Sequence, residues 1–318
     1  MRRTVLVLIG LLAATPGSAQ QLAPDGGRVT APEIEAIDPD RFGSRPADAA
    51  YSAYQRGYYI TALNLATPLA LDGDPAAQAL IGEIYSSGLG VRRDMAKAVE
   101  WYGKAAEQDV PEALFQLAMI LLDGGAEFRD EERAFSLMER AADAGHRLAR
   151  FNFAQMLADR DPTERGRERA AEYYEMAAEG GLADAQYAMA QFFRNGTGGK
   201  PVDLDKARYW LELAANQNYD TAQIELGTML VEGRGGAEQE KAGFAWLMRA
   251  ARAGNPAAQN RVAKLYRSGV GVEADRVTAV AWYLRARRAG LVDQVMEDHI
   301  DGLTEEELDL ARRRAAIL

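Results

Sequence analysis

Residues 77–106 read AQALIGEIYSSGLGVRRDMAKAVEWYGKAA, and this stretch recurs in outline five more times along the chain. Each copy opens with an alanine, and successive opening alanines are 36 or 37 residues apart. A small residue stands five positions after each alanine, and a bulky residue three positions later. An internal period of this length is typical of repeat proteins, so the repeat decides the fold. The opening alanines are Ala77, Ala113, Ala149, Ala185, Ala222 and Ala258.

Each repeat unit is predicted to contain two helices, which we call helix A and helix B. In the first unit they cover about Ala77–Ser86 and Met95–Glu107. The apolar residues of this helix B recur at the 3.6-residue period of an α-helix, so they form one stripe. A glycine or alanine five positions into helix A lets the helix lie close to its neighbour. The stripe consists of Ala98, Trp101, Tyr102 and Ala105.

Glycine-rich turns separate the predicted helices, because glycine readily adopts the positive φ angles that end one helix and direct the next. Gly88-Leu89-Gly90 is the turn of the first unit. In the third unit Asp161-Pro162-Thr163 replaces the glycines, so we expect a loop of different shape there. Four glycines are predicted to end helix B in the same way, namely Gly145, Gly180, Gly254 and Gly290.

One helix pair cannot bury both of its faces, so neighbouring pairs must stack. The sequence therefore predicts an all-α, right-handed α-solenoid superhelix of six to seven helix pairs over residues 47–290. Residues 48–73 form a shorter N-terminal unit, and capping helices follow over 291–318. In the last helix Thr304 and Glu307 form a capping-box pattern, and Leu308, Ala311 and Ala315 form its apolar stripe.

The N-terminus has the three parts of a secretory signal peptide. Arg2 and Arg3 precede an apolar run over Val5–Leu12, and small residues lead to a predicted cleavage after Ala19. The apolar run is about half of the ~20 residues that a membrane anchor needs, which favours cleavage. We therefore expect residues 1–19 to be a signal peptide and the proline- and glycine-containing residues 20–46 to be a flexible linker. The chain has no cysteine, which excludes a lipoprotein and suits an exported, periplasmic protein.

Composition excludes several kinds of chemistry. The formal net charge of −10 argues against a nucleic-acid partner. Without cysteine there is no thiol nucleophile, and with two histidines a catalytic triad or a metal cluster has little support. We interpret His146 as a solvated turn residue and His299 as part of a solvated acidic surface. No catalytic, cofactor-binding or metal-ligating residue is predicted, and the four tryptophans share a repeat register that indicates core positions.

The pattern Ala-x-x-x-Ile-Gly-x-x-Tyr-x-x-Gly-x-Gly-Val-x-x-Asp, which starts at Ala77, continues to Trp101-Tyr102 and Ala105-Ala106. It resembles the Sel-one-like repeat family, which is related to the tetratricopeptide repeats. The resemblance covers about Ala77 to Gly290 and is weaker in the turns of the second and third units. It implies an adaptor protein that assembles other proteins.

Helix A is expected to line the concave side of such a superhelix. Its unassigned positions lie three, six and ten residues after each opening alanine. They are rich in amides, acidic in the fifth unit and basic in the sixth, which suits a groove for an extended peptide or a protein loop. The candidate partner-binding residues are Gln116, Asn152, Gln155, Gln191, Glu225, Arg261 and Lys264.

The sequence thus predicts a non-catalytic periplasmic scaffold that binds a protein or peptide, with no cofactor, no nucleic acid and no membrane span after signal cleavage. Two alternatives stay open. One is a periplasmic regulator that restrains a membrane sensor kinase, and the other is an accessory to a cell-wall or carbohydrate hydrolase. An adaptor would show a stoichiometric partner, whereas an enzyme would show a saturable activity lost on substitution of one carboxylate.

Overall fold

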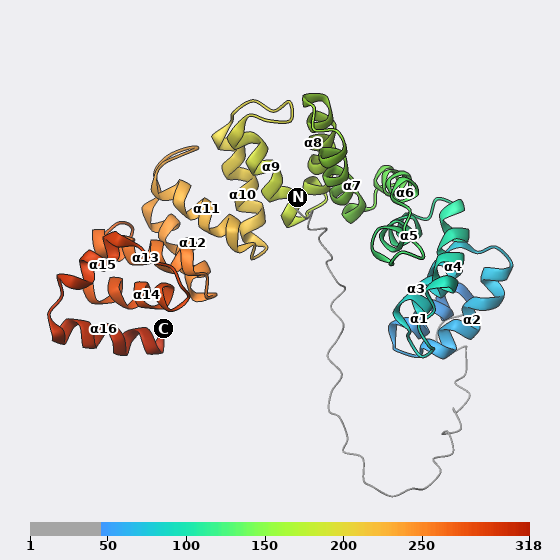
Figure 1. Ribbon diagram of the computed structural model, residues 1–318, viewed down its shortest axis with the longest axis horizontal. Helices are drawn as coiled ribbons and strands as arrows, with labels where there is room; N and C mark the ends of the chain where they lie inside the picture. The colour runs from blue at the N-terminus through green and yellow to red at the C-terminus, as the bar shows by residue number, and fades with distance from the viewer. Residues whose placement is uncertain (1–45) are drawn as a thin grey trace, which may run out of the picture. The chain divides into compact units, whose positions relative to one another are not determined.

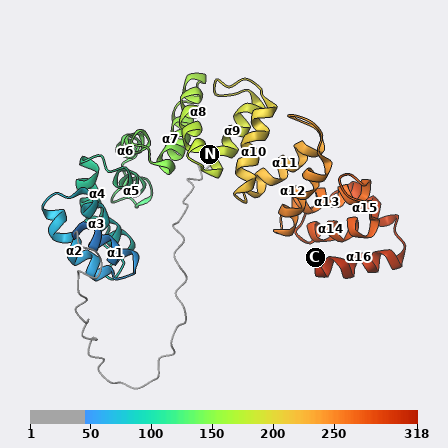
Figure 2. The same ribbon diagram turned by 180° about the vertical axis from the view of Figure 1, so that it is seen from behind.

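A computed structural model describes residues 46–318 of the chain (Figures 1 and 2). The predicted signal peptide and linker, residues 1–46, therefore lie outside the described residues except for Pro46. Residues 46–318 contain sixteen helices and no strand. The described chain divides into two compact units, and the boundary in the sequence falls after Asn152.

Unit 1 contains three helix pairs and the start of a fourth. In each pair an odd-numbered helix is helix A and the following even-numbered helix is helix B. The helices are α1 (Pro46–Gln55), α2 (Tyr59–Leu71), α3 (Pro75–Ser87), α4 (Met95–Glu107), α5 (Pro111–Asp123), α6 (Glu131–Asp143) and α7 (Arg147–Arg160), whose second half belongs to unit 2.

Unit 2 continues the same alternation of helix A and helix B. Within each unit, most helices B pack against both their own helix A and the next one, so the predicted all-α solenoid is confirmed. The helices of unit 2 after α7 are α8 (Glu164–Glu179), α9 (Ala183–Asn195), α10 (Leu204–Asn216), α11 (Asp220–Val231), α12 (Glu240–Arg252), α13 (Pro256–Ser268), α14 (Arg276–Arg288), α15 (Gln294–Asp301) and α16 (Glu305–Ile317).

The small residue of helix A has the predicted packing role. Gly82 of α3 lies directly against the ring of Tyr102 on α4, and a Cβ atom at Gly82 would lie 2.7 Å from Tyr102 Cδ1. Gly227 of α11 approaches α12 as closely, because its Cβ would lie 2.7 Å from Leu247 Cγ. A side chain at either position would push the two helices of the pair apart.

A residue in the left-handed conformation follows each helix B. The prediction for Gly145, Gly254 and Gly290 is confirmed, but that for Gly180 is wrong. Gly180 has φ −69°, and its neighbour Gly181 makes the turn with φ +84°. Two units use a non-glycine residue at this position. The seven residues are Gly73, Asp109, Gly145, Gly181, Asn218, Gly254 and Gly290.

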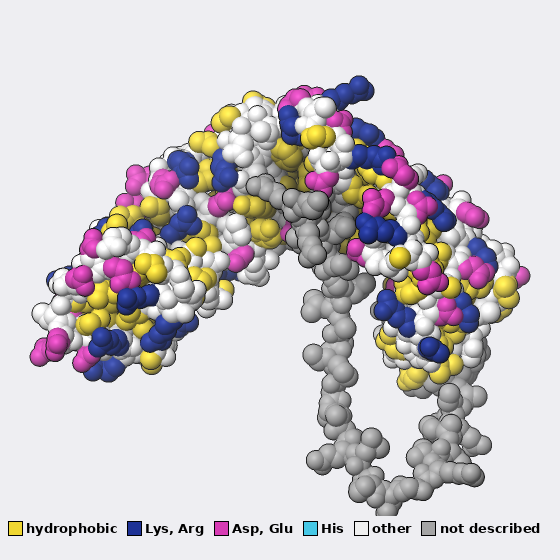
Figure 3. Space-filling model, in the orientation of Figure 1, with side chains coloured by type: hydrophobic (Ala, Val, Ile, Leu, Met, Phe, Trp, Pro, Cys, Tyr) yellow, Lys and Arg dark blue, Asp and Glu magenta, His cyan; other side chains and the backbone are white. Residues whose placement is uncertain are grey.

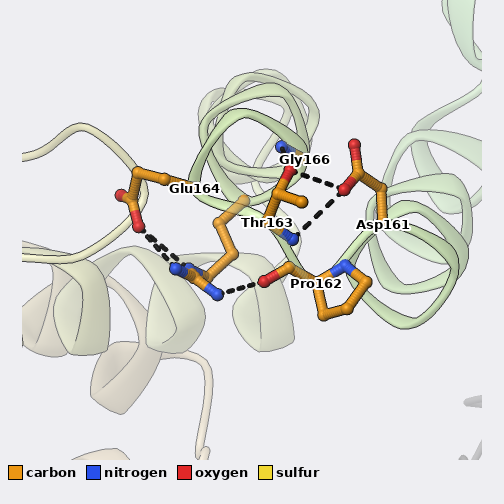
Figure 4. A network of polar contacts seen from close by, with 6 residues as sticks. Asp161, Pro162, Thr163, Glu164 and Gly166 are labelled. Atoms are coloured by element: carbon orange, nitrogen blue, oxygen red, sulfur yellow. Dashed lines mark hydrogen bonds and ion pairs between the residues drawn. The ribbon is translucent and has the colours of Figure 1, made fainter.

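The connection between α7 and α8 differs from the glycine-rich turns, as predicted. Only residues 161–163 separate the two helices. Asp161 Oδ1 accepts hydrogen bonds from the Thr163 backbone N–H (3.1 Å) and hydroxyl (2.6 Å), and the Thr163 hydroxyl accepts from Gly166 N (3.3 Å) (Figure 4). Thr163 is thus the N-cap of α8, and the polar turn replaces glycine with side-chain hydrogen bonds.

At the C-terminal end of unit 2, α16 packs on α14. Ala311 and Ala315 are buried against Val280 and Ala281, and Leu308 packs beside them, so the predicted apolar stripe is confirmed. The capping box of Thr304 and Glu307 is also present. These contacts cover the face of α14 that a further repeat would otherwise cover.

The tryptophans divide into two groups. Trp210 and Trp282 are buried core residues, as predicted. Trp101 and Trp246 are half-buried, and a cation lies over each ring, Lys104 at 4.0 Å and Arg249 at 5.5 Å from the ring centroid. The core interpretation therefore fits the first pair better than the second. Among the described helices, none combines the length and apolar character needed to cross a membrane.

Candidate partner-binding face

The predicted binding residues lie on the odd-numbered helices, as expected. We define the helix-A face as the positions three and six residues after each opening alanine. Gln116 lies on α5, Asn152 and Gln155 on α7, Gln191 on α9, Glu225 on α11, and Arg261 and Lys264 on α13. On the side drawn in Figure 3, acidic and basic side chains are interspersed with hydrophobic ones over both units.

The structure brings two of these residues together in unit 2. Gln191 Nε2 donates to Glu225 Oε2 (2.9 Å), so α9 and α11 are joined across neighbouring repeats. Arg194 Nη1 lies 2.8 Å from the same oxygen, and the Tyr187 hydroxyl donates to Glu225 Oε1 (2.8 Å). Glu225 therefore receives three donors at a half-buried position, and this cluster holds its polar groups in fixed places.

An aromatic pair flanks this cluster. The rings of Tyr187 and Tyr219 are stacked with 5.2 Å between centroids. Burial, together with the carboxylate of Glu225, raises the pKa of Tyr187, and burial beside Asp184 and Asp220 raises that of Tyr219. Both hydroxyls are therefore neutral at physiological pH and can donate hydrogen bonds next to the ion pair of Arg194 and Glu225.

The basic residues of α13 differ in their surroundings. Arg261 is exposed, whereas Lys264 Nζ forms an ion pair with Asp293 Oδ2 at 2.5 Å. Asn260 Nδ2 donates to the same carboxylate (2.9 Å). Burial alone would raise the pKa of Asp293, but the hydrogen bonds from Lys264 and Asn260 lower it below its usual value. Arg261 thus exposes its charge to solvent, while Lys264 is held in an ion pair with Asp293, the N-cap residue of α15.

Asn152 is a correction to the predicted site. Its side chain is 1% exposed, and its Nδ2 contacts Met119 Sδ at 3.8 Å, so it is a core residue rather than a surface ligand. The register is the same as that of exposed Arg261, but α7 packs more tightly at this position.

Gln155 is half-buried and its Oε1 has no partner among the described residues. Gln116 is half-buried and donates to Glu112 Oε1 (2.7 Å).

The interpretation of His146 as a solvated turn residue is wrong. Its ring stacks on Phe115 with 4.4 Å between centroids, and Nε2 lies 3.0 Å from Glu112 Oε2. Nδ1 accepts a hydrogen bond from Ala149 N (3.1 Å), so the imidazole caps the N-terminus of α7. The hydrogen bond with His146 lowers the pKa of Glu112, although burial opposes it.

His299 also differs from its predicted environment. Its Nε2 is buried and has no hydrogen-bond partner among the described residues. The nearby Glu297 has other partners, because its Oε1 accepts a hydrogen bond from the Tyr283 hydroxyl (2.5 Å) and forms an ion pair with Arg287 Nε (2.9 Å). In the described part of the chain, no three or more His, Cys, Asp or Glu side chains gather where they could hold a metal ion.

Sequence reasoning missed a set of buried glutamines. Gln78, Gln186, Gln223 and Gln259 each follow an opening alanine, and each Nε2 donates to a backbone carbonyl eight residues earlier, at 3.1 to 3.2 Å. The acceptor lies near the C-terminus of the preceding helix B, so each amide joins two successive repeats. Recurrence of glutamine at one register in four of six units was the signal that could have revealed them.

Comparisons with known proteins agree with the repeat architecture. The chain is similar to a Sel1 repeat protein from Oxalobacter formigenes, with 25% sequence identity, a TM-score of 0.62, and coverage of 77% of this chain and 97% of that one. It also shares its fold with c5321, a protective antigen present in uropathogenic Escherichia coli strains that displays an SLR fold. That match has 24% identity, a TM-score of 0.52, and coverage of 85% of this chain and 68% of the other. No curated protein matches the chain.

The Sel1 repeat model matches six consecutive segments, which are residues 75–110, 111–146, 147–182, 183–219, 220–255 and 256–291. Sel1 repeat proteins are generally protein-interaction scaffolds and are typically non-catalytic. Because the six segments follow one another without a gap over more than half of its length, the chain belongs to the Sel1 repeat family.

Proposed function

We propose that this chain is an exported, non-catalytic scaffold that binds a protein or peptide partner on its helix-A face. The observation that carries this proposal is the cluster around Glu225, in which Gln191 and Arg194 of one repeat meet the carboxylate of the next. Polar groups that are already held in place lose little side-chain entropy when a partner binds. The cluster therefore supports recognition of polar groups on a partner.

The proposed location is the periplasm. It is supported by the signal-peptide pattern of residues 1–19 and by the absence of cysteine from the sequence. Cleavage would remove Arg2 and Arg3 and leave a more acidic mature chain. An acidic scaffold favours basic partners by long-range attraction.

Site-specific crosslinking tests the proposed surface. A photo-crosslinking residue would replace Gln116, Gln191 or Arg261 in the exported protein, and mass spectrometry would identify the adducts. Asn152 is unsuitable because it is buried. Tyr209 on helix B of the fourth repeat is 56% exposed and serves as the control position.

One dominant protein captured from the three helix-A positions and not from position 209 would support the proposal. If the captured protein is a membrane sensor kinase, this chain is a regulator of that kinase. If the captured protein is a cell-wall hydrolase, this chain is an accessory to that enzyme. Capture from position 209 alone would contradict the helix-A assignment. A saturable activity of the purified chain that one carboxylate substitution abolishes would contradict the non-catalytic assignment.

A further inference from the structure

A small apolar cup lies between α1 and α3 in unit 1. Its apolar lining residues are Ala50, Tyr51, Ala76, Ala77 and Leu80, and the polar residues Asp48 and Ser52 complete the lining. Ala50, Ala77 and Leu80 form a buried floor, whereas Tyr51 is 58% exposed. Three alanines leave space that larger side chains would fill, so the cup can accept one aliphatic side chain. Leu80 is the helix-A position three residues after Ala77, so the cup belongs to the helix-A face.

Glu83 lies three residues beyond Leu80 on α3, so it is on the same face of this helix as Leu80. Its carboxylate accepts hydrogen bonds from the Tyr102 hydroxyl (2.8 Å) and the Ser87 hydroxyl (2.8 Å). No lysine or arginine among residues 48–318 forms an ion pair with Glu83. Neutral donors therefore orient this carboxylate and leave its charge uncompensated.

Tyr54 of α1 lies close enough to Glu83 to be affected by its charge. Tyr54 lies three residues beyond Tyr51 on α1, and its ring packs against Tyr59 with 5.6 Å between centroids. Burial, followed by the carboxylates of Glu83 and, to a smaller extent, Glu112, raises the pKa of Tyr54 to about 12. Glu83 thus contributes negative charge at this end of the α1–α3 surface, which is complementary to a cation.

We propose that the α1–α3 surface recognises an extended segment of a partner protein in which an aliphatic residue is followed, two positions later, by a lysine or arginine. The aliphatic side chain occupies the cup and the cation reaches Glu83. This proposal rests on the proposed function, because it names the partner chemistry for one part of the helix-A face.

The spacing of the two subsites suits an extended peptide. Three residues along α3 advance about 4.5 Å at 1.5 Å per residue. In an extended strand, residues two apart point to the same side and lie about 6.6 Å apart. The flexible stem of a lysine or arginine covers the difference, and the intervening side chain points to solvent.

The experiment uses fluorescein-labelled peptides and the mature full-length chain, residues 20–318. The probe peptide carries Leu-Thr-Lys between flanking Gly-Ser residues, and fluorescence anisotropy measures its affinity. Comparison peptides carry Ser-Thr-Lys, Leu-Thr-Glu or the shifted order Leu-Lys-Thr. We expect the Ser-Thr-Lys peptide to bind at least about tenfold more weakly, since one buried aliphatic side chain contributes about that much. Leu-Thr-Glu brings a like charge to Glu83 and Leu-Lys-Thr moves the cation to the other side of the strand, so both should also bind more weakly.

Two variants of the protein test the subsites. A76F fills the cup from its exposed rim, and E83Q removes the charge while keeping an acceptor for Tyr102. Each should weaken the Leu-Thr-Lys peptide about tenfold, and A76F should abolish the advantage of leucine over serine. The matched controls are A245F and E100Q, which make the same changes at exposed helix-B positions and should leave binding unchanged.

Equal binding of Leu-Thr-Lys and Leu-Thr-Glu, or unchanged binding by A76F, would overturn the proposal. Binding that appears only after deletion of residues 20–45 would also overturn it, because the chain's own segment would then be the occupant. If crosslinking from Gln191 and Arg261 captures a partner whose binding is insensitive to A76F and E83Q, this inference fails while the scaffold function stands. If the peptide behaves as expected but no helix-A position captures a protein, the scaffold function fails instead.

Discussion

Arg140 Nη2 lies 2.6 Å from Asp109 Oδ1, and Asp109 has a φ of +56°. The same arrangement recurs in unit 2, where Arg249 Nη2 lies 2.5 Å from Asn218 Oδ1 and Asn218 has a φ of +66°. In both cases a non-glycine residue follows the C-cap of one helix B, and an arginine from the next helix B binds its side chain. The side-chain contact thus accompanies the turns that lack glycine.

Substitutions at position 109 should separate the energetic effect of the left-handed backbone conformation from that of the contact with Arg140. D109A keeps the left-handed strain of an L-residue and loses the contact with Arg140, so it should lower the free energy of unfolding by about 1 kcal/mol. D109G loses the contact but relieves the strain, and D109N keeps an acceptor, so both should stay within about 0.5 kcal/mol of the parent. Chemical denaturation measures all three. D109A matching D109G would show that the backbone conformation carries no cost.

The contact of Gly82 with Tyr102 makes a second stability prediction. G82A places a Cβ 2.7 Å from the ring, so it should destabilise by about 1 to 3 kcal/mol through overpacking. Gly103 lies on α4 with nothing within 4 Å of its Cβ position, and it is the matched control. G103A should stabilise by up to about 1 kcal/mol because alanine is the better helix former. The same sign for both variants in thermal unfolding would contradict the packing argument.

The buried glutamines allow a test of coupling between repeats. Gln186 Nε2 donates to Ala178 O (3.2 Å), and its Oε1 accepts from Gln217 Nε2 (2.8 Å). Q186M retains the side-chain volume but loses both hydrogen bonds, so it should cost about 1 to 2 kcal/mol. Q191M removes an amide of the half-buried surface and should cost less. Urea denaturation measures the free energy of unfolding of both variants. Equal stability of Q186M and Q191M would contradict the coupling role of Gln186.

Much of the fold followed from the sequence because each landmark recurs in one register. The small residue at Gly82, the helix-B stripe and the capping box are local features, and local chemistry determines their roles. The turn after α8 shows the limit of this reasoning. Gly180 and Gly181 are adjacent, and only the length of the helix decides which of them takes the positive φ.

The candidate site was harder to predict. Asn152 and Arg261 occupy the same register, yet one is buried against Met119 and the other is exposed. The difference arises from side chains on the neighbouring helices, which a repeat register does not specify. The pairing of Gln191 with Glu225 likewise depends on contacts between repeats, so the residue types were predicted and their partnership was not.

His299 makes the final prediction, which concerns pH. Burial lowers its pKa below the ordinary value of about 6.5, and the positive charges of Arg276 and Arg267 act in the same direction, while Glu307 opposes them. The folded chain therefore keeps this imidazole neutral at a pH where the unfolded chain binds a proton. By linkage, stability should fall as the pH drops below about 6.5 and should level off below the pKa of the folded state. H299L should show a smaller loss of thermal stability between pH 7.5 and 5.5 than the parent.

H146N is the matched control, since asparagine caps a helix at the same register in Asn255 and keeps the N-cap of α7. A pH dependence that persists unchanged in H299L, or an NMR titration of His299 with a midpoint above 6.5, would contradict this assignment.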